Sequence, residues 1–346
     1  MKLEIIEEID GEIAHFYEPC TNTTLYSVAN TFFGMVNGES FKFTLSVPLK
    51  IKVLKNIRLI RRLLRFDKSS AVFNYKKDGI IILYQGMIFF YDLKSREIKI
   101  VGQLRQCRNV LHSGIAVSEN GVYFGEYGHN AERESVPVWS SLDDGRSWSV
   151  IYEFGAGTIK HVHGVYLDKF TNDLWIPTGD FEGECYLVNV PQGDFDNITF
   201  FGDGTQSWRP VSLFFDEEKI CWVMDSQLED SYLQVFDRRT KKIEKGKVFP
   251  GPVWYSKEFT DNVRILATTV EIGPGSTIND ANIYGSSDFS NWQLLKSFRK
   301  DFFPKRFFKF GVVSFAEGEQ DSSDFVIHGE ALKMLDGKIL KVRIKL

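Results

Sequence analysis

Short apolar runs alternate with Gly, Pro, Asn and Asp along this chain, and four stretches follow one plan. In each, an apolar strand begins just after a small or polar residue, turns, and returns as a second strand that ends in a carboxylate. The four stretches are residues 113–126, 163–180, 209–225 and 251–271. Their starts lie 50, 46 and 42 residues apart. Several short strands repeated at such a period indicate a β-propeller.

The number of repeats predicts the number of blades. Unit starts near residues 24, 71, 114, 164, 210, 252 and 311 predict seven blades, with six as the alternative because the first unit is poorly patterned. In that unit, 24–28 and 41–45 read as strands, with Gly34 and Asn37-Gly38 as turn signals. The strand-like ends 3–8 and 338–344 have no neighbour in sequence, so we expect them to share and close one blade. The prediction is an all-β, seven-bladed propeller that forms a single domain over 1–346.

Residues 50–65 break this pattern, because they carry seven cations and no acid. The preferred interpretation is an outer strand with a solvated basic face. A membrane-surface or polyanion-binding stripe is the first alternative. The second alternative places Arg61, Arg62 or Arg65 at the mouth of the propeller, because the run leads directly into the strand that starts at Ala71.

Composition supports a large β core and narrows the choice of partners. Hydrophobic residues make up 43% of the chain and aromatic residues 14%, which favours strands. A net charge of −4 provides no global basic field for nucleic acid, although a local site can still bind an anion. The four cysteines are too widely spaced for a zinc ribbon, and no disulfide framework is expected. The acidic N-terminus does not resemble a signal peptide and no run approaches a membrane span, so we expect a cytoplasmic protein.

The repeat also predicts where polar side chains gather. In an antiparallel pair, the start of one strand and the end of the next lie at the same end of the sheet. Six side chains at such positions should therefore meet at one mouth of the propeller: Glu126, His161, His163, Asp180, Arg209 and Asp225. The three carboxylates are the acid/base candidates. For Asp180 and Asp225, the alternative is that they cap backbone N–H groups between blades.

His161 and His163 are two residues apart, so on a strand they share one face. Three interpretations stay open for the pair. The imidazoles bind a divalent metal together with Asp180 or Glu126; they act as acid, base or charge stabiliser on a glycan; or one is satisfied by backbone carbonyls while the other is exposed. His112 stands at the equivalent position one blade earlier, which favours a shared central site. No other cofactor is expected.

Further polar and aromatic residues complete the predicted site. Tyr127 is an acid/base or nucleophile candidate in a segment that we expect to open into a loop. Adjacent residues on a strand face opposite ways, so Tyr127 can cooperate with Glu126 only if the strand has ended; otherwise it packs between blades. Arg209 would clamp a sugar carboxylate or neutralise one of the aspartates. The other substrate-binding candidates are His112, Asn130, Gln206 and Arg65.

Residues 141–148, Ser-Leu-Asp-Asp-Gly-Arg-Ser-Trp, carry the most specific motif in the chain. They resemble the Asp box, S-x-D-x-G-x-T/S-W, of the sialidase superfamily and related BNR-repeat propellers. Residues 286–292 resemble a degenerate copy that lacks the glycine. In this family the box is a structural turn between the third and fourth strands of a blade, away from the substrate. We therefore expect the Asp to accept backbone N–H bonds, the Gly to adopt positive φ, and the Trp to pack between sheets.

The resemblance implies a carbohydrate-active propeller. The lead hypothesis is an enzyme that cleaves a glycosidic bond in an acidic glycan, in the manner of a glycoside hydrolase. The first blades lack the R-x-P motif with which sialidases bind the substrate carboxylate. A mouth rich in His, Tyr and Arg also resembles that of seven-bladed polysaccharide lyases, in which a His or Tyr removes the proton α to a uronate carboxylate. The remaining alternative is a non-catalytic propeller that binds glycan or protein.

Overall fold

The protein is a seven-bladed, all-β propeller built from seven four-stranded antiparallel sheets. The computed structural model describes residues 1–47, 53, 57–308 and 310–345. The predicted fold class and blade number are confirmed. The chain forms two compact units, of which the first comprises Met1–Lys68, Ser226–Tyr232 and Gly246–Leu346, and the second Ser69–Asp225 and Leu233–Lys245.

The first unit contains three of the sheets. Their strands, in the order of pairing, are β2 (Ile13–Glu18), β3 (Thr23–Val28), β4 (Thr31–Val36) and β5 (Glu39–Thr44); β22 (Val253–Glu258), β23 (Arg264–Thr268), β24 (Asp280–Ser286) and β25 (Gln293–Arg299); and β26 (Val312–Phe315), β27 (Phe325–Glu330), β28 (Ile339–Lys345) and β1 (Lys2–Ile9). The prediction that the two chain ends share one blade is confirmed, because β1 pairs with β28 in antiparallel register from Lys2 and Lys345 to Ile9 and Ile339.

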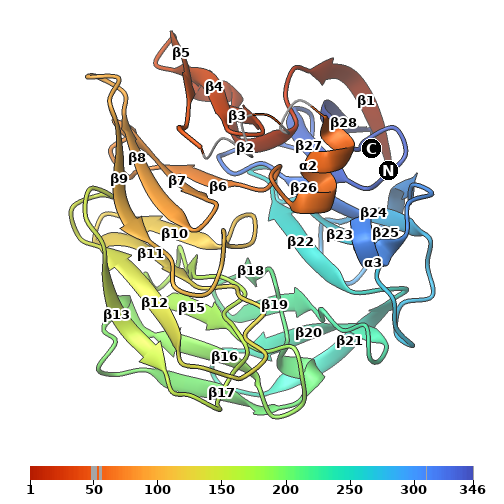
Figure 1. Cartoon of the computed structure of the whole chain (residues 1–346). Coiled ribbons are helices and arrows are strands. Elements are labelled where there is room, and N and C mark those ends of the chain that lie inside the picture. Colours follow the sequence, from red (N-terminus) through yellow and green to blue (C-terminus); the bar gives the residue numbers. More distant parts are fainter. Residues whose placement is uncertain (48–52, 54–56, 309, 346) are drawn as a thin grey trace. The chain divides into compact units, whose positions relative to one another are not determined.

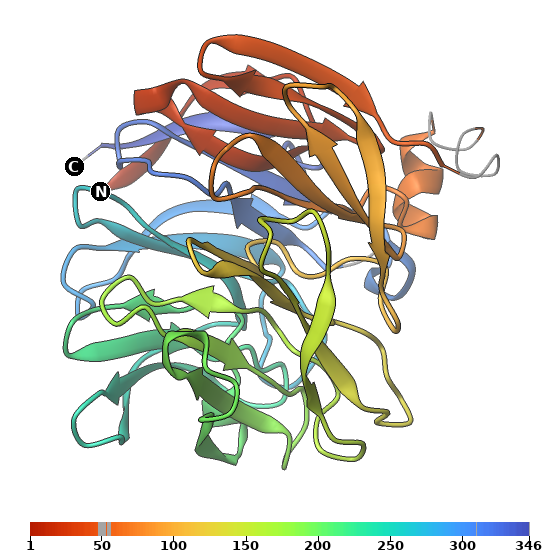
Figure 2. The same cartoon turned by 90° about the vertical axis from the view of Figure 1, so that its left-hand side faces the viewer.

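The other four sheets lie wholly or mainly in the second unit. Their strands are β6 (Ser70–Phe73), β7 (Gly79–Tyr84), β8 (Met87–Asp92) and β9 (Ile98–Gln103); β10 (Ile115–Ser118), β11 (Gly121–Gly125), β12 (Val136–Ser141) and β13 (Ser149–Phe154); β14 (Tyr166–Leu167), β15 (Leu174–Pro177), β16 (Cys185–Val190) and β17 (Thr199–Gly204); and β18 (Phe214–Phe215), β19 (Lys219–Val223), β20 (Ser231–Asp237) and β21 (Ile243–Phe249). Figure 2 shows the sheets β6–β9 and β10–β13 from the side.

Each sheet changes from apolar to polar across its width. All six residues of β7 are buried, whereas in β9 of the same sheet no residue is buried. The apolar run of β7 fits a strand that is covered on both faces, while β9 can expose its side chains to water. Apolar clusters join neighbouring sheets, as where Val136 and Val138 of β12 pack with Val188 and Val190 of β16. The polar residues at the strand ends are thus attached to strands whose apolar side chains are buried away from water.

Two details of the first predicted blade are wrong. The blade begins at β2, at Ile13, and not near residue 24. Gly34 is not in a turn but in the middle of β4, paired with Leu25 of β3. A Cβ atom at Gly34 would lie 2.0 Å from the carbonyl oxygen of Thr24, so the glycine permits a close approach of the two strands.

The basic segment does not form the predicted outer strand within the described residues. Residues 58–64 form the helix α2 (Arg58–Leu64), while 48–52 and 54–56 lie outside the described residues. The spacing of three and four residues brings the arginines of α2 onto one face. There they pair with acids: Arg62 with Asp301 and Asp336, and Arg61 with Glu12. The cations of α2 are consequently not a solvated stripe.

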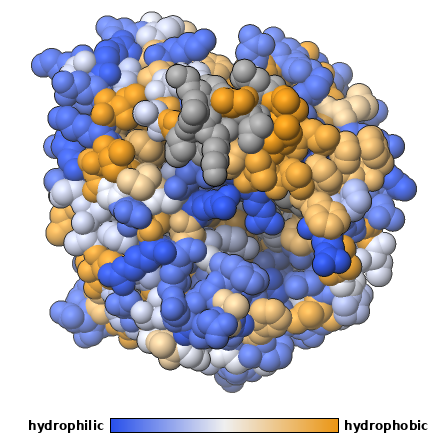
Figure 3. Space-filling model, in the orientation of Figure 1, coloured by the Kyte–Doolittle hydropathy of each residue, from blue (hydrophilic) through white to orange (hydrophobic). Residues whose placement is uncertain are grey.

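The opposite side of α2 is apolar and exposed. Ile57, Leu59 and Leu63 expose about half of their surface, and Phe307 does so on the neighbouring helix α3 (Lys305–Phe308). The two helices contact each other, and Figure 3 shows apolar side chains gathered over the part of the surface that α2 and α3 occupy in Figure 1. In the described part of the chain, no helix has the length and apolar character needed to cross a membrane.

The motif at residues 141–148 forms the expected turn between the third and fourth strands of its sheet, β12 and β13. The Asp143 carboxylate accepts hydrogen bonds from the backbone N–H groups of Arg146 and Ser147, at 3.1 and 2.8 Å. Gly145 has φ of +96°, where a Cβ atom would lie 2.5 Å from Ile81. Trp148 packs against the apolar cluster that joins this sheet to β6–β9. All of these residues serve the scaffold.

Candidate functional site

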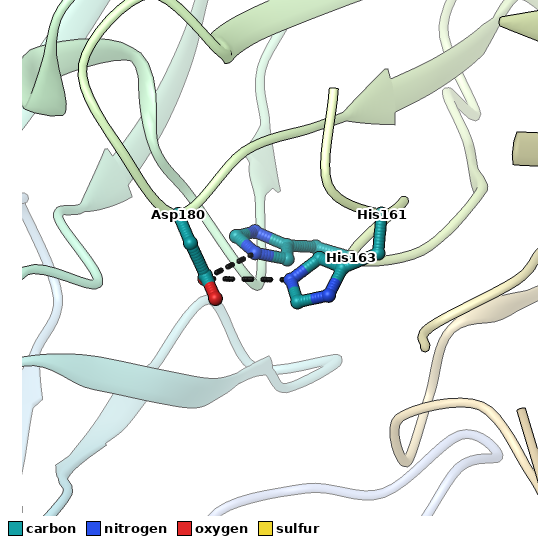
Figure 4. Close-up of side chains that lie close together, drawn as sticks. All are labelled: His161, His163 and Asp180. Carbon is teal, nitrogen blue, oxygen red and sulfur yellow. Dashed lines mark ion pairs between the residues drawn. The ribbon is translucent and has the colours of Figure 1, made fainter. Parts of the chain in front are cut away.

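Two adjacent segments of the second unit bring the histidines to a carboxylate. Residues 161–163 precede β14, and Asp180 follows β15. The backbone N–H of His163 donates to the carbonyl of Pro177, and Val162 forms a bridge with Thr178. Val162 is fully buried in the apolar core, so the flanking imidazoles share the opposite face, as predicted from their spacing. Figure 4 shows both imidazoles directed at the Asp180 carboxylate.

Hydrogen bonds to backbone carbonyls determine which ring nitrogen carries the proton. Nδ1 of His161 lies 2.8 Å from the carbonyl oxygen of Gly128, and Nδ1 of His163 lies 2.7 Å from that of Pro210. A carbonyl can only accept, so each Nδ1 carries a hydrogen and donates it. In the neutral ring, Nε2 is then left with a lone pair.

The Nε2 atoms of both histidines are buried and face the same carboxylate oxygen. They lie 3.3 Å (His161) and 3.5 Å (His163) from Oδ1 of Asp180. Among the described residues, neither Nε2 atom makes a hydrogen bond. Two lone pairs are therefore directed at an acceptor oxygen, which is an unfavourable arrangement unless a proton or a cation lies between them.

Two cations hold Asp180 from its other sides. Nζ of Lys160 lies 2.5 Å from Oδ2, and Nη2 of Arg209 lies 2.7 Å from Oδ1 and 3.2 Å from the Asp225 carboxylate. Burial alone would raise the pKa of Asp180, but the imidazoles and Arg209 lower that pKa well below its usual range. Burial lowers the pKa of His163. These five polar side chains, His161, His163, Lys160, Asp180 and Arg209, are called the histidine cluster below.

Two aromatic rings lie next to the histidine cluster. The ring centroid of Tyr127 lies 4.1 Å from that of His161 and 6.0 Å from that of His163. Phe181 is 45% exposed, and Nζ of Lys160 lies 5.3 Å from the centroid of its ring. Sequence reasoning identified Tyr127 but assigned no role to Lys160 or Phe181. Lys160 directly precedes His161, and Phe181 directly follows Asp180. This adjacency is the only sequence signal that could have identified them as site residues.

The structure gives the predicted candidates different roles. The structure brings His161, His163, Asp180, Arg209 and Asp225 together through the contacts described above, with the ring of Tyr127 tilted against that of His161. The Glu126 carboxylate is fully buried and accepts hydrogen bonds from the backbone N–H groups of Arg105 and Gln106 and from the indole of Trp139, at 2.7, 2.6 and 2.9 Å. Its oxygens are engaged in holding the loop after β9.

Two predicted substrate-binding residues, Asn130 and Gln206, form hydrogen bonds to members of the histidine cluster. The Asn130 amide donates to the carbonyl of Lys160 at 3.0 Å, and Gln206 donates to the carbonyl of Asp180 at 3.2 Å. Gln206 also accepts a hydrogen bond from Arg209 at 3.1 Å. Both amides therefore position members of the histidine cluster.

The remaining two candidates lie elsewhere in the chain. His112 is half-buried in the loop before β10. Arg65 belongs to the first unit, where it ends α2 in the left-handed conformation with φ of +57°. Their proposed contacts with substrate stay predictions.

Comparison with known proteins supports the fold and goes no further. No family model matches the chain, and no curated protein matches it in sequence. Among solved structures, it is similar to U3-55K with 9% identity and a TM-score of 0.54 (99% of this chain, 98% of that one). It is also similar to the AfRom2 CNH domain with 6% identity and a TM-score of 0.55 (100% and 99%). A third similar structure is the extracellular domain of BT4673 from B. thetaiotaomicron, with 10% identity and a TM-score of 0.56 (99% and 40%).

These similarities define the class of the protein as a seven-bladed β-propeller. At such low identities they show the fold alone. The resemblance to the sialidase superfamily and BNR-repeat propellers rests on the turn motif, which is structural here. Any function must accordingly be inferred from the histidine cluster.

Proposed function

We propose that this protein is a carbohydrate-active enzyme that cleaves a carboxylate-bearing glycan by β-elimination. The observation that carries the proposal is the enclosure of Asp180 by Lys160, Arg209 and two imidazoles. In this arrangement, positively charged side chains lie next to side chains that can exchange protons. Removal of a proton next to a sugar carboxylate needs a group that accepts the proton and positive charge that stabilises the resulting enolate.

The same enclosure disfavours the hydrolase hypothesis. Glycoside hydrolysis by a carboxylate pair requires one carboxylic acid that stays protonated and donates to the leaving oxygen. The pKa of Asp180 is held well below its usual range, and Asp225 shares the guanidinium of Arg209. Both carboxylates are therefore suited to remain ionised and to orient cations. Glu126, the third candidate acid, is occupied by three scaffold donors.

We assign the proton transfer to Tyr127 and the charge stabilisation to the histidine cluster. The Nε2 atoms of both histidines are buried, so they are poorly placed to reach a carbon of a bulky sugar. Tyr127 is only half-buried, and its ring contacts that of His161 at a tilt of 36°. Phe181 offers an exposed ring on which a sugar can lie.

The proposed reaction is balanced without water or an oxidant. The hydroxyl oxygen of Tyr127, as the phenolate, takes the proton from the carbon α to the carboxylate. The C–H electrons form an enolate whose negative charge is stabilised by Lys160, the more exposed of the two cations, and by the electrostatic field of the buried Arg209. The C–O bond at the β carbon then breaks, the electron pair forms a C=C bond, and the leaving oxygen takes the proton from Tyr127. The products are a shortened glycan and an unsaturated uronate.

An absorbance assay tests this proposal directly, because an unsaturated uronate absorbs in the near ultraviolet and a hydrolysis product does not. The protein is incubated with glycans of galacturonate, glucuronate and mannuronate, and absorbance and new reducing ends are followed together. We expect both to rise in equal amounts. Tyr127→Phe should lower turnover by about 10²- to 10⁴-fold, the usual contribution of a positioned acid/base group. Tyr152→Phe, the same change on the outer strand β13, is the matched control.

Two outcomes would contradict the proposal. New reducing ends without the absorbance would indicate hydrolysis. Saturable binding of a uronate glycan without any turnover, unchanged by Tyr127→Phe, would indicate a non-catalytic binding protein.

A further inference from the structure

We infer that His161, His163 and Asp180 bind one divalent transition-metal ion through the two Nε2 atoms and Oδ1. The inference rests on the proposed function only for the role of the ion at the substrate carboxylate. The binding itself follows from the buried atoms that the scaffold leaves without a hydrogen bond.

The first argument is the number of lone pairs that need a partner. A proton on one imidazole satisfies one Nε2 atom and leaves the other without a hydrogen bond. Two protons would place two imidazolium ions side by side, with ring centroids 5.1 Å apart, next to the cations Lys160 and Arg209. A single metal ion takes both nitrogen lone pairs and one carboxylate lone pair at the same time.

The second argument is the spacing of the donor atoms. Metal–ligand bonds of roughly 2.1 Å at tetrahedral angles separate two donor atoms by roughly 3.4 Å. The Oδ1 atom of Asp180 lies 3.3 and 3.5 Å from the two Nε2 atoms, and the three donors all lie within 4.8 Å of one another. Two of the three donor separations thus already match those of ligands on one ion.

The third argument is the support behind the ligands. Metal-binding histidines usually donate their second ring N–H to a backbone carbonyl or carboxylate, which orients the ring and selects the tautomer. His161 and His163 both do so, toward Gly128 and Pro210. Lys160 and Arg209 fix the carboxylate of Asp180. The orientation that the ion requires is therefore provided by the scaffold.

The donor set selects the class of metal. Two imidazole nitrogens and one carboxylate oxygen suit Zn²⁺, Mn²⁺, Fe²⁺, Co²⁺ or Ni²⁺, whereas Ca²⁺ and Mg²⁺ prefer sites made of oxygen. Three protein ligands leave at least one coordination position open. The ion, Lys160 and Arg209 would together carry more positive charge than Asp180 and Asp225 neutralise. An anionic ligand, such as the carboxylate of the proposed substrate, would balance that excess.

The primary test measures metal binding by the whole chain without substrate. Tag-free protein is analysed for bound metals by plasma mass spectrometry, stripped with a chelator, and titrated with Zn²⁺ and with Mn²⁺. We expect one ion per chain and a rise in melting temperature on loading. Pulsed electron paramagnetic resonance of the Mn²⁺ form should show coupling to histidine nitrogen. The inference is overturned if wild-type protein takes up neither ion stoichiometrically, or if bound Mn²⁺ shows no nitrogen coupling.

Variants locate the site. His163→Ala and Asp180→Asn should each weaken binding by more than about 100-fold, since they remove ligands and not merely their supports. His129→Ala is the matched control, because His129 is exposed in the loop that follows β11 and should leave binding unchanged. Equal losses in all three variants would argue for nonspecific binding. The nitrogen coupling in wild-type protein keeps the inference testable if a buried variant fails to fold.

The metal test and the absorbance assay fail independently. Stoichiometric metal with histidine coupling but no turnover would leave this inference standing and remove the proposed function. Turnover of a uronate glycan by protein that binds no metal and is insensitive to chelator would support the proposed function and overturn the metal inference.

Discussion

Two clusters of buried charged residues in this protein differ in how their polar groups are paired. In the first unit, the arginine cluster consists of Arg58, Arg61 and Arg62 on α2 with Glu12, Asp301 and Asp336, and salt bridges link each arginine to an acid. In the second unit, the histidine cluster contains two buried Nε2 atoms that make no hydrogen bond within the described part of the chain. The side chains of the two clusters are buried to a similar degree and carry a similar density of charge, so neither property shows which cluster is functional.

The difference teaches how to distinguish a structural cluster from a functional one. A buried charge is costly unless it is paired, and a scaffold that only needs stability pairs every charge. Among the described residues, buried atoms without a hydrogen bond occur in both clusters, since Nε of Arg61 and Oε2 of Glu12 lack one as well. Only the histidine cluster, however, directs two nitrogen lone pairs at one carboxylate oxygen, and a site retains such an arrangement when it serves a ligand. The arginine cluster therefore fits a role in attaching α2, while the histidine cluster fits a role in binding.

The largest expected effect on stability comes from breaking the arginine cluster. Arg62 is 6% exposed, and its Nη2 lies 2.8 Å from Asp301. Arg62→Ala breaks the buried pairs with Asp301 and Asp336, although Lys300 still contacts Asp301, and should lower the free energy of unfolding by about 3–5 kcal/mol. Denaturant unfolding measures the loss.

The control for this prediction replaces Arg62, Asp301 and the second cation on Asp301, Lys300, by apolar side chains of similar size. Arg62→Met combined with Asp301→Leu and Lys300→Met should recover much of the stability, because no buried charge of this group stays unpaired and Asp336 keeps Arg58. Metal content per folded chain should stay at the wild-type value in both variants. A fall in metal content without loss of stability would reverse the assignment of the two clusters.

A smaller effect is expected at Glu126, which sequence reasoning placed among the catalytic acids. Glu126→Gln turns an amide N–H toward at least one of three donors that now bind the carboxylate. The mismatch should cost about 1–3 kcal/mol of unfolding free energy. If Glu126 serves the scaffold, turnover per folded molecule stays within about twofold of wild type. A loss of turnover comparable to that of Tyr127→Phe, at unchanged stability, would return Glu126 to the catalytic residues.

The smallest effect is expected at an exposed ion pair of the same region. Arg105 and Glu153 lie 2.9 Å apart, and their side chains are 50% and 39% exposed. Solvent screens such pairs, so Arg105→Gln should change the unfolding free energy by about 0.5 kcal/mol or less. A loss as large as that of Arg62→Ala would show that burial is not what distinguishes the arginine cluster. Thermal and denaturant unfolding at two salt concentrations provide the comparison.

Much of the fold was predictable because it depends on local patterns repeated along the chain. The turn motif at 141–148 and the strand-like character of the two chain ends each follow from a few neighbouring residues. The helix α2 was not predictable in this way. From the sequence alone, its arginines are expected to face solvent. Their acidic partners Glu12, Asp301 and Asp336 are distant in sequence and are identified only in the folded structure.

The candidate site was predictable in its membership but not in its roles. The spacing of His161 and His163 and the antiparallel repeat identified five of the residues that meet, because strand geometry alone brings them to one end of their sheets. Glu126 satisfies the same rule, yet its side chain binds the loop after β9. A one-residue difference in where a strand ends decides the direction of a side chain, and a sequence pattern does not resolve that difference.

By itself, the sequence determined a seven-bladed architecture and the set of strand ends from which a site could be built, since alternation and turn residues act locally. Only the tertiary structure decided which of those residues form the site. The carbonyls of Gly128 and Pro210 orient the two imidazoles, and they come from loops 33 and 47 residues away from the rings that they bind. Contacts over such distances depend on the packing of neighbouring sheets, so the unfilled lone pairs that point to a metal ion became visible only in three dimensions.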